Sequence, residues 1–301
     1  MQLRNKLLIT SALIALFACE SKKGSGESAF DSLMVQKAEE QESQLTSELA
    51  LGVIRSIPSP IEMSVLIKEV GAKYSPSILN STSNSQNYNT NAKRAMNMGI
   101  YGADLGYINI YNQKQDAITY LNSITGLAED LKIGHFFDIT TLKRMATNSS
   151  NLDSLLYIST SNFEYLNNYL QDQNRGNLST FMLLGGWIEA LHVATEVAKN
   201  NKSQKLIEKI GEQKVVLDQL MLLFDIYKSD PSAAEISPFL KDLKASYDKV
   251  LITQEYREPT ITEVNGIMMV TDNSVTKINI TPDLILEISN KVKNVRNKIV
   301  S

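Results

Sequence analysis

The chain has 301 residues, a length that can bury one large hydrophobic core or two smaller ones. Its apolar fraction of 43% and charged fraction of 21% are those of an ordinary globular protein, and 7 prolines with 14 glycines argue against a disordered chain. A net charge of -3 does not favour contact with phosphate backbones, so we expect no nucleic-acid partner.

The N-terminus has the order of features found in an export signal. Two basic residues, Arg4 and Lys6, precede the largely apolar stretch 7–17. This stretch is shorter than the about 20 residues that a membrane-spanning helix needs, but it has the length of a signal-peptide core. Ala18 and Cys19 follow it, and Cys19 is the only cysteine of the chain. A lone cysteine forms no internal disulfide bond, so the stability of the fold must come from packing.

The residues Leu16-Phe17-Ala18-Cys19 resemble the lipobox of bacterial lipoproteins. The resemblance implies that residues 1–18 are a signal peptide and that the Cys19 thiol carries fatty-acyl chains such as palmitate. It also implies a membrane-anchored protein of the bacterial cell envelope, which we expect at the outer membrane, facing the periplasm. Stable attachment takes at least two acyl chains, because one chain binds a membrane only marginally. Residues 19–28 are small and polar and are predicted to form a flexible tether.

Residues 29–301 are predicted to form one helical domain. A helical pattern covers 29–56, and Ser59-Pro60 is expected to begin a new helix, since serine caps helices and proline is tolerated in the first turn. That helix should end near Gly71. Residues 75–91 are rich in Asn and Ser, whose side chains compete for backbone hydrogen bonds, so they are predicted to form a long loop. Such loops are often functional or mobile, and the sequence leaves both alternatives open.

The stretch 91–111 is predicted to form a helix with an unusually smooth face. Small residues recur along it at spacings of three and four: Ala92, Ala95, Gly99, Gly102 and Gly106. A glycine inside a helix lowers stability by about 1 kcal/mol relative to alanine, so a compensating contact is required. A second helix backbone that approaches closely is the leading interpretation. The alternative is a groove for a small, partly apolar ligand, lined by Gly99, Gly102, Gly106 and Tyr107.

The other faces of this helix are also largely apolar, which predicts a place at the centre of the bundle. Gly185-Gly186 lies in another predicted helix, from about residue 178 to residue 199. A glycine pair can offer the same smooth surface, so we expect these two helices to pack closely against each other.

Apolar periodicity predicts further amphipathic helices that share one core. One carries the stripe Leu206, Ile210, Leu217, Leu220 and Phe224. Another carries Ile236, Phe239, Leu243 and Tyr247 behind a start signal at Ser237-Pro238, and the last is expected to open at Thr281-Pro282.

Residues 260–280 are rich in Val, Ile and Thr and are predicted to form one small β-hairpin. With Asp272-Asn273 at the turn, Ile267 and Met269 should face Thr276 and Ile278. The predicted fold class is therefore all-α, a multi-helix bundle of about seven to nine helices with one β-hairpin before the C-terminal helix.

The candidate metal ligands are Glu189, His192 and Glu196. Glu-x-x-His on a helix is half of the motif found in carboxylate-bridged di-metal bundles, because positions three apart face the same way. The second half is missing, since the only other histidine, His135, has Lys132 three residues before it. On a helical wheel the three candidates lie on a flank. The leading interpretation is a partly exposed histidine beside solvated carboxylates, which contribute little to stability.

No other motif indicates catalysis or a cofactor. The chain lacks the G-x-S-x-G turn of serine hydrolases and the glycine-rich phosphate loops of nucleotide-binding proteins. Beyond the lipobox, it is similar to uncharacterised all-helical envelope lipoproteins, a resemblance that implies no activity. We therefore expect a non-enzymatic lipoprotein without a cofactor that acts as a helical scaffold or binds a protein partner in the envelope. The alternatives are the ligand groove and the metal site described above.

Overall fold

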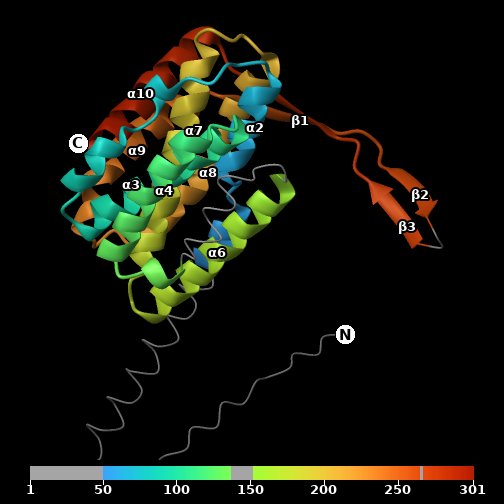
Figure 1. The fold of residues 1–301 in the computed structure, drawn as a ribbon. Helices are drawn as coiled ribbons and strands as arrows, with labels where there is room; N and C mark the ends of the chain where they lie inside the picture. The colour runs from blue at the N-terminus through green and yellow to red at the C-terminus, as the bar shows by residue number, and fades with distance from the viewer. Residues whose placement is uncertain (1–49, 137–151, 265–266) are drawn as a thin grey trace, which may run out of the picture. The chain divides into compact units, whose positions relative to one another are not determined.

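The computed structural model describes residues 50–136, 152–264 and 267–301. The expected signal peptide, the tether and the first part of the helical domain lie outside these residues. Helices dominate the described part of the chain, and the predicted all-α fold is confirmed (Figure 1). The α-helices are α2 (Pro60–Glu69), α3 (Asn91–Ile110), α4 (Lys114–Asp130), α6 (Leu152–Asp172), α7 (Gly176–Ala198), α8 (Gln204–Ile226), α9 (Pro231–Tyr247) and α10 (Pro282–Val300).

Two of the predicted helix starts are confirmed by their caps. The side chain of Ser59 accepts a hydrogen bond from the backbone N–H of Ile61 at 3.4 Å, with Pro60 as the first residue of α2. The side chain of Thr281 accepts one from the N–H of Leu284 at 3.2 Å at the start of α10. Helix α2 ends just before Gly71, whose φ of 80° only glycine adopts readily.

The predicted start of α9 at Ser237-Pro238 is wrong. Helix α9 begins earlier, at Pro231, and the side chain of Asp230 caps it by accepting a hydrogen bond from the N–H of Ser232 at 2.7 Å. Asp230-Pro231 is the same kind of start signal as Ser237-Pro238, and it precedes the apolar stripe by a full turn. Pro238 is accommodated inside the helix.

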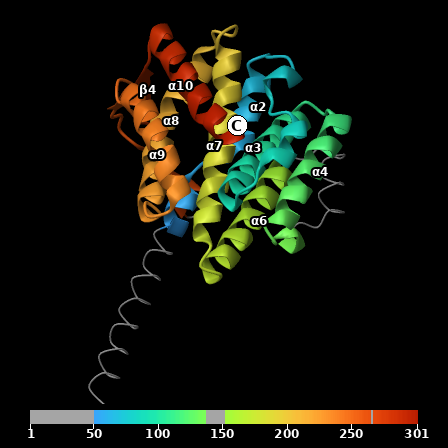
Figure 2. The same cartoon turned by 90° about the vertical axis from the view of Figure 1, so that its left-hand side faces the viewer.

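Helices α3 and α7 form the centre of the bundle. Helix α7 packs against α3, α10, α2, α8 and α6, and Figure 2 shows it between α3 on one side and α8 and α9 on the other. Its length and hydropathy would also suit a membrane span, but 83% of its most apolar window is buried inside the protein. Residues 50–69 have a similar length and hydropathy, but they form two helical segments, residues 50–56 and α2, separated by residues 57–59.

The strands form an arm of two antiparallel ladders in place of the single predicted hairpin. Strand β1 (Leu251–Glu255) pairs with β4 (Val275–Asn279), and β2 (Thr260–Val264) pairs with β3 (Ile267–Thr271). The predicted register is wrong, because Met269 lies opposite Thr262 and Ile278 lies opposite Ile252. In the sequence, the dipeptide Asn265-Gly266 stands between β2 and β3, and it is a stronger hairpin signal than Asp272-Asn273.

The first ladder joins the arm to the helices. Strand β4 packs on α8, and Ile278 fills the space beside Gly211, where an added Cβ would lie 2.5 Å from its Cγ2 atom. The amine of Lys214 donates a hydrogen bond to the carbonyl of Val250 at 2.8 Å, directly before β1. The base of the arm is therefore anchored to α8, and Figure 1 shows β2 and β3 extending beyond it.

Candidate functional site

Helices α3 and α7 cross with their backbones in contact, so the predicted close-packed pair is confirmed. A Cβ added to Gly99 would lie 1.9 Å from the carbonyl oxygen of Met182, and one added to Gly185 would lie 1.8 Å from that of Met96. No side chain fits in either space. Close packing of the two helices therefore explains why glycine occupies positions 99 and 185.

The other residues of the predicted ligand groove, Gly102, Gly106 and Tyr107, do not lie at this helix crossing. Gly106 is covered by Ile61, whose Cγ1 would lie 2.9 Å from an added Cβ, whereas Gly102 is exposed and has nothing within 4 Å. Tyr107 is buried, and its hydroxyl accepts a hydrogen bond from the N–H of Ser75 at 3.1 Å. The smooth face is thus divided between a helix contact, a side-chain contact and open solvent.

The predicted exposure of the Glu189 flank is wrong, because Glu189 is 0% exposed and His192 is 6% exposed. Helix α10 covers this flank, and Arg296 donates two hydrogen bonds to the Glu189 carboxylate, from Nε to Oε2 at 2.5 Å and from Nη2 to Oε1 at 2.7 Å. Glu196 instead pairs with Lys199. Among the described residues no group of His, Cys, Asp and Glu is arranged to hold a metal ion.

A second carboxyl group, that of Asp104 on α3, is buried beside this ion pair. Burial and then the charge of Glu189 raise the pKa of Asp104 well above its usual value of 3.8, whereas Arg296 lowers it. Burial also lowers the pKa of His192. Burial thus favours the neutral forms of both Asp104 and His192.

The loop 75–90 is fastened over this buried cluster. The N–H of Asn80 donates a hydrogen bond to Asp104 at 3.1 Å, and the Tyr120 hydroxyl donates one to the Asn80 carbonyl at 2.9 Å. The Tyr101 hydroxyl donates to the Ser81 carbonyl at 2.9 Å. Asn80 is buried in consequence. Asp104, Tyr101 and Tyr120 thus hold this loop against the helices.

Within the described residues, exposed apolar side chains gather on the ribbon formed by β2 and β3, whose exposure the sequence did not predict. Its exposed fractions are 59% at Ile261, 64% at Met268, 51% at Met269 and 67% at Val270. The register places Ile261 opposite Val270 on one face and Met269 on the other. Both faces therefore carry exposed apolar side chains. The sequence shows that the ribbon is poor in charge, since Glu263 is the only charged residue in 260–271, but it does not show that the ribbon is exposed.

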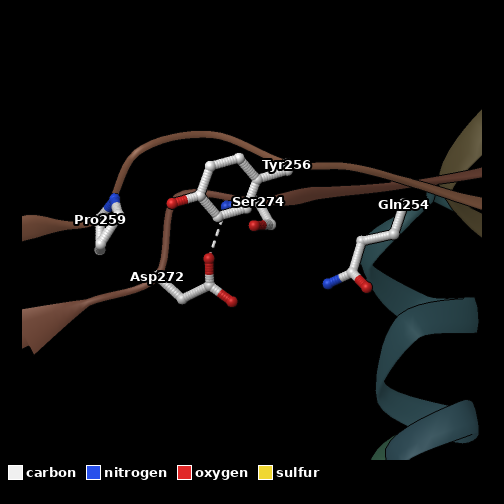
Figure 3. Close-up of a pocket in the computed structure, with 5 residues that line it drawn as sticks. All are labelled: Gln254, Tyr256, Pro259, Asp272 and Ser274. Carbon is white, nitrogen blue, oxygen red and sulfur yellow. Dashed lines mark hydrogen bonds between the residues drawn. The ribbon is translucent and has the colours of Figure 1, made fainter.

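A small hollow of about 330 Å³ marks the junction of the two ladders (Figure 3). It is lined by Gln254, Tyr256, Pro259, Asp272 and Ser274. The N–H of Ser274 donates a hydrogen bond to Asp272 at 2.8 Å, which lowers the pKa of Asp272. The Asn273 amide donates to the Glu258 carbonyl at 2.7 Å and so ties the two sides of the arm together where strand pairing is interrupted.

The ribbon is the candidate functional site, because four exposed apolar side chains lie there beside unpaired strand edges. Comparison with known proteins adds no assignment. No family model matches the chain, and neither a curated protein nor a solved structure matches it.

Proposed function

We propose that this protein is a lipid-anchored, non-enzymatic module of the bacterial envelope that binds a protein partner through the ribbon β2–β3. The proposal joins two observations. The lipobox resemblance at Cys19 supports attachment to a membrane. The exposed ribbon supports binding of a protein partner. The exposure of apolar side chains on β2 and β3 is the main support for the proposed binding.

Water, hydrocarbon and a protein surface differ in how well they stabilise such a ribbon. A two-stranded ribbon is marginal in water, and its apolar side chains gain free energy when they are covered. Hydrocarbon would cover them, but it leaves the backbone groups of both outer edges without hydrogen bonds. A protein surface supplies apolar cover and backbone partners together, which is the way in which sheets recruit an additional strand.

The placement of the polar core residues supports a non-enzymatic role. Glu189 and Arg296 bind each other, and Asp104 holds the loop 75–90. These groups are enclosed by α3, α7 and α10. These groups stabilise the domain, whereas the partner binds at the arm.

The test compares the native complex size of three forms of the full-length chain extracted from its own membrane in mild detergent. The ribbon variant carries Met268→Glu and Val270→Glu. The matched control carries Leu222→Glu and Leu286→Glu, which are exposed by 62% and 49% on helices α8 and α10. Because all four positions are exposed, each variant should keep its circular dichroism and melting temperature.

We expect the unchanged chain and the control to migrate in a complex larger than the chain alone, and the ribbon variant to migrate as a single chain. If all three forms have the same size, the ribbon does not bind a protein and the proposal fails.

A further inference from the structure

We propose that the partner of the ribbon is a second copy of this chain, bound edge to edge along β3. This inference rests on the proposed function, since it names the protein that the ribbon binds. Within the described residues, β3 pairs with β2 alone. Alternate residues of β3 therefore direct their backbone N–H and C=O groups away from β2, toward an edge that has no strand partner.

The two edges of the ribbon differ in charge. Strand β3, Ile267–Thr271, contains no charged residue, whereas β2 carries Glu263 near its centre. A charged side chain on an edge strand opposes the addition of another strand, because the carboxylate would lose water on pairing. The β3 edge is therefore the open one.

The sequence of β3 is also complementary to itself. An antiparallel pair with a two-fold axis through Met269 places Met269 opposite its own copy and Met268 opposite Val270 of the other copy. Both contacts join apolar side chains. The same arrangement of β2 about Thr262 would place Glu263 opposite Ile261 twice. Self-association is thus favoured at β3 and opposed at β2.

This difference also limits the size of the assembly. Pairing two β3 strands gives a four-stranded sheet in the order β2-β3-β3-β2, with the Glu263-bearing strands outermost. Each copy contributes the same edge, so the contact is symmetric and closes at two copies. The charged outer edges then oppose the addition of a third ribbon.

Disulfide trapping in the native cell tests this register. The full-length chain is produced with Met269→Cys or with Thr262→Cys, two positions that lie opposite each other in the ribbon. Directly opposed residues of antiparallel strands lie about 4.5–5.5 Å apart at Cα, within the range of a disulfide bond. The unchanged chain, with Cys19 alone, gives the background. Met268→Cys and Val270→Cys chains produced together test the same pairing without a substitution on the axis.

We expect Met269→Cys to shift from monomer to a reducible dimer, the mixed pair to do the same, and Thr262→Cys to stay at background. If both Met269→Cys and the mixed pair stay at background, or Thr262→Cys dimerises equally, the inference is overturned. If the ribbon variant with two glutamates nevertheless shrinks the native complex, another protein occupies the ribbon and the proposed function stands without this partner. If the ribbon variant also changes nothing, both proposals fail.

Discussion

The crossing of α3 and α7 allows one residue type to be tested in two opposite environments. Gly185→Ala adds a Cβ that would lie 1.8 Å from the carbonyl oxygen of Met96. Gly102→Ala adds the same atom to α3, where nothing lies within 4 Å. Both changes replace a helical glycine by alanine, so the gain in helix propensity is the same and only the contact differs.

The expected effects have opposite signs. At Gly185 the contact must open from 1.8 Å to at least 3.0 Å, which real Cβ contacts require. Two backbones at the centre of the bundle would have to separate, and overpacking of this kind lowers stability by about 1–3 kcal/mol, occasionally more. The propensity gain of about 1 kcal/mol offsets part of this loss. We expect a net loss of up to about 2 kcal/mol at Gly185 and a gain of up to about 1 kcal/mol at Gly102.

Urea unfolding followed by circular dichroism measures both changes on one scale, as differences in the free energy of unfolding. Gly99→Ala provides a replicate from the other side of the crossing, since its Cβ would lie 1.9 Å from the Met182 carbonyl oxygen. A Gly185→Ala protein that is as stable as Gly102→Ala would refute the backbone contact.

Two further predictions concern the buried cluster. Arg296→Met leaves Glu189 as a buried unpaired carboxylate and should lower the free energy of unfolding by about 3–5 kcal/mol, whereas adding Glu189→Leu should recover most of the loss in the same urea assay. If the double variant is no more stable than the single one, the pairing is not what stabilises Glu189. The raised pKa of Asp104 makes the folded state retain a proton that the unfolded state releases above 3.8. Its contribution is therefore fully present below that value and declines as pH rises toward the folded-state pKa. Asp104→Asn keeps an acceptor for Asn80 without this titration, so its stability relative to the unchanged chain should increase from about pH 4 to about pH 8; a constant difference across this range would contradict the assignment.

Local signals predicted much of the fold. The caps at Ser59 and Thr281 depend on residues next to each other in the chain, so the sequence alone was sufficient to place α2 and α10. The glycine spacing of 91–111 and the pair Gly185-Gly186 also predicted the closest helix contact. A glycine within a helix lowers stability unless a neighbour uses the space, so its presence indicates that neighbour.

A contact between distant residues accounts for the error at Glu189. The burial of Glu189 depends on Arg296, 107 residues away, and a helical wheel contains no information about which helix covers a flank. The predicted hairpin register was wrong because it placed the turn at Asp272-Asn273, although Asn265-Gly266 is the stronger turn signal in the sequence. The exposure of the ribbon could not be predicted for a related reason. Apolar strand residues normally indicate a packed face, and only the three-dimensional arrangement leaves both faces of β2–β3 exposed.

The proposed function requires that a protein covers the ribbon in the cell. A photo-reactive amino acid at Val270, compared with one at the similarly exposed Leu222, tests this directly in intact cells. We expect illumination to give a discrete protein adduct from Val270 and none from Leu222. A Val270 probe that reacts only with lipid, or forms no adduct at all, would contradict the claim.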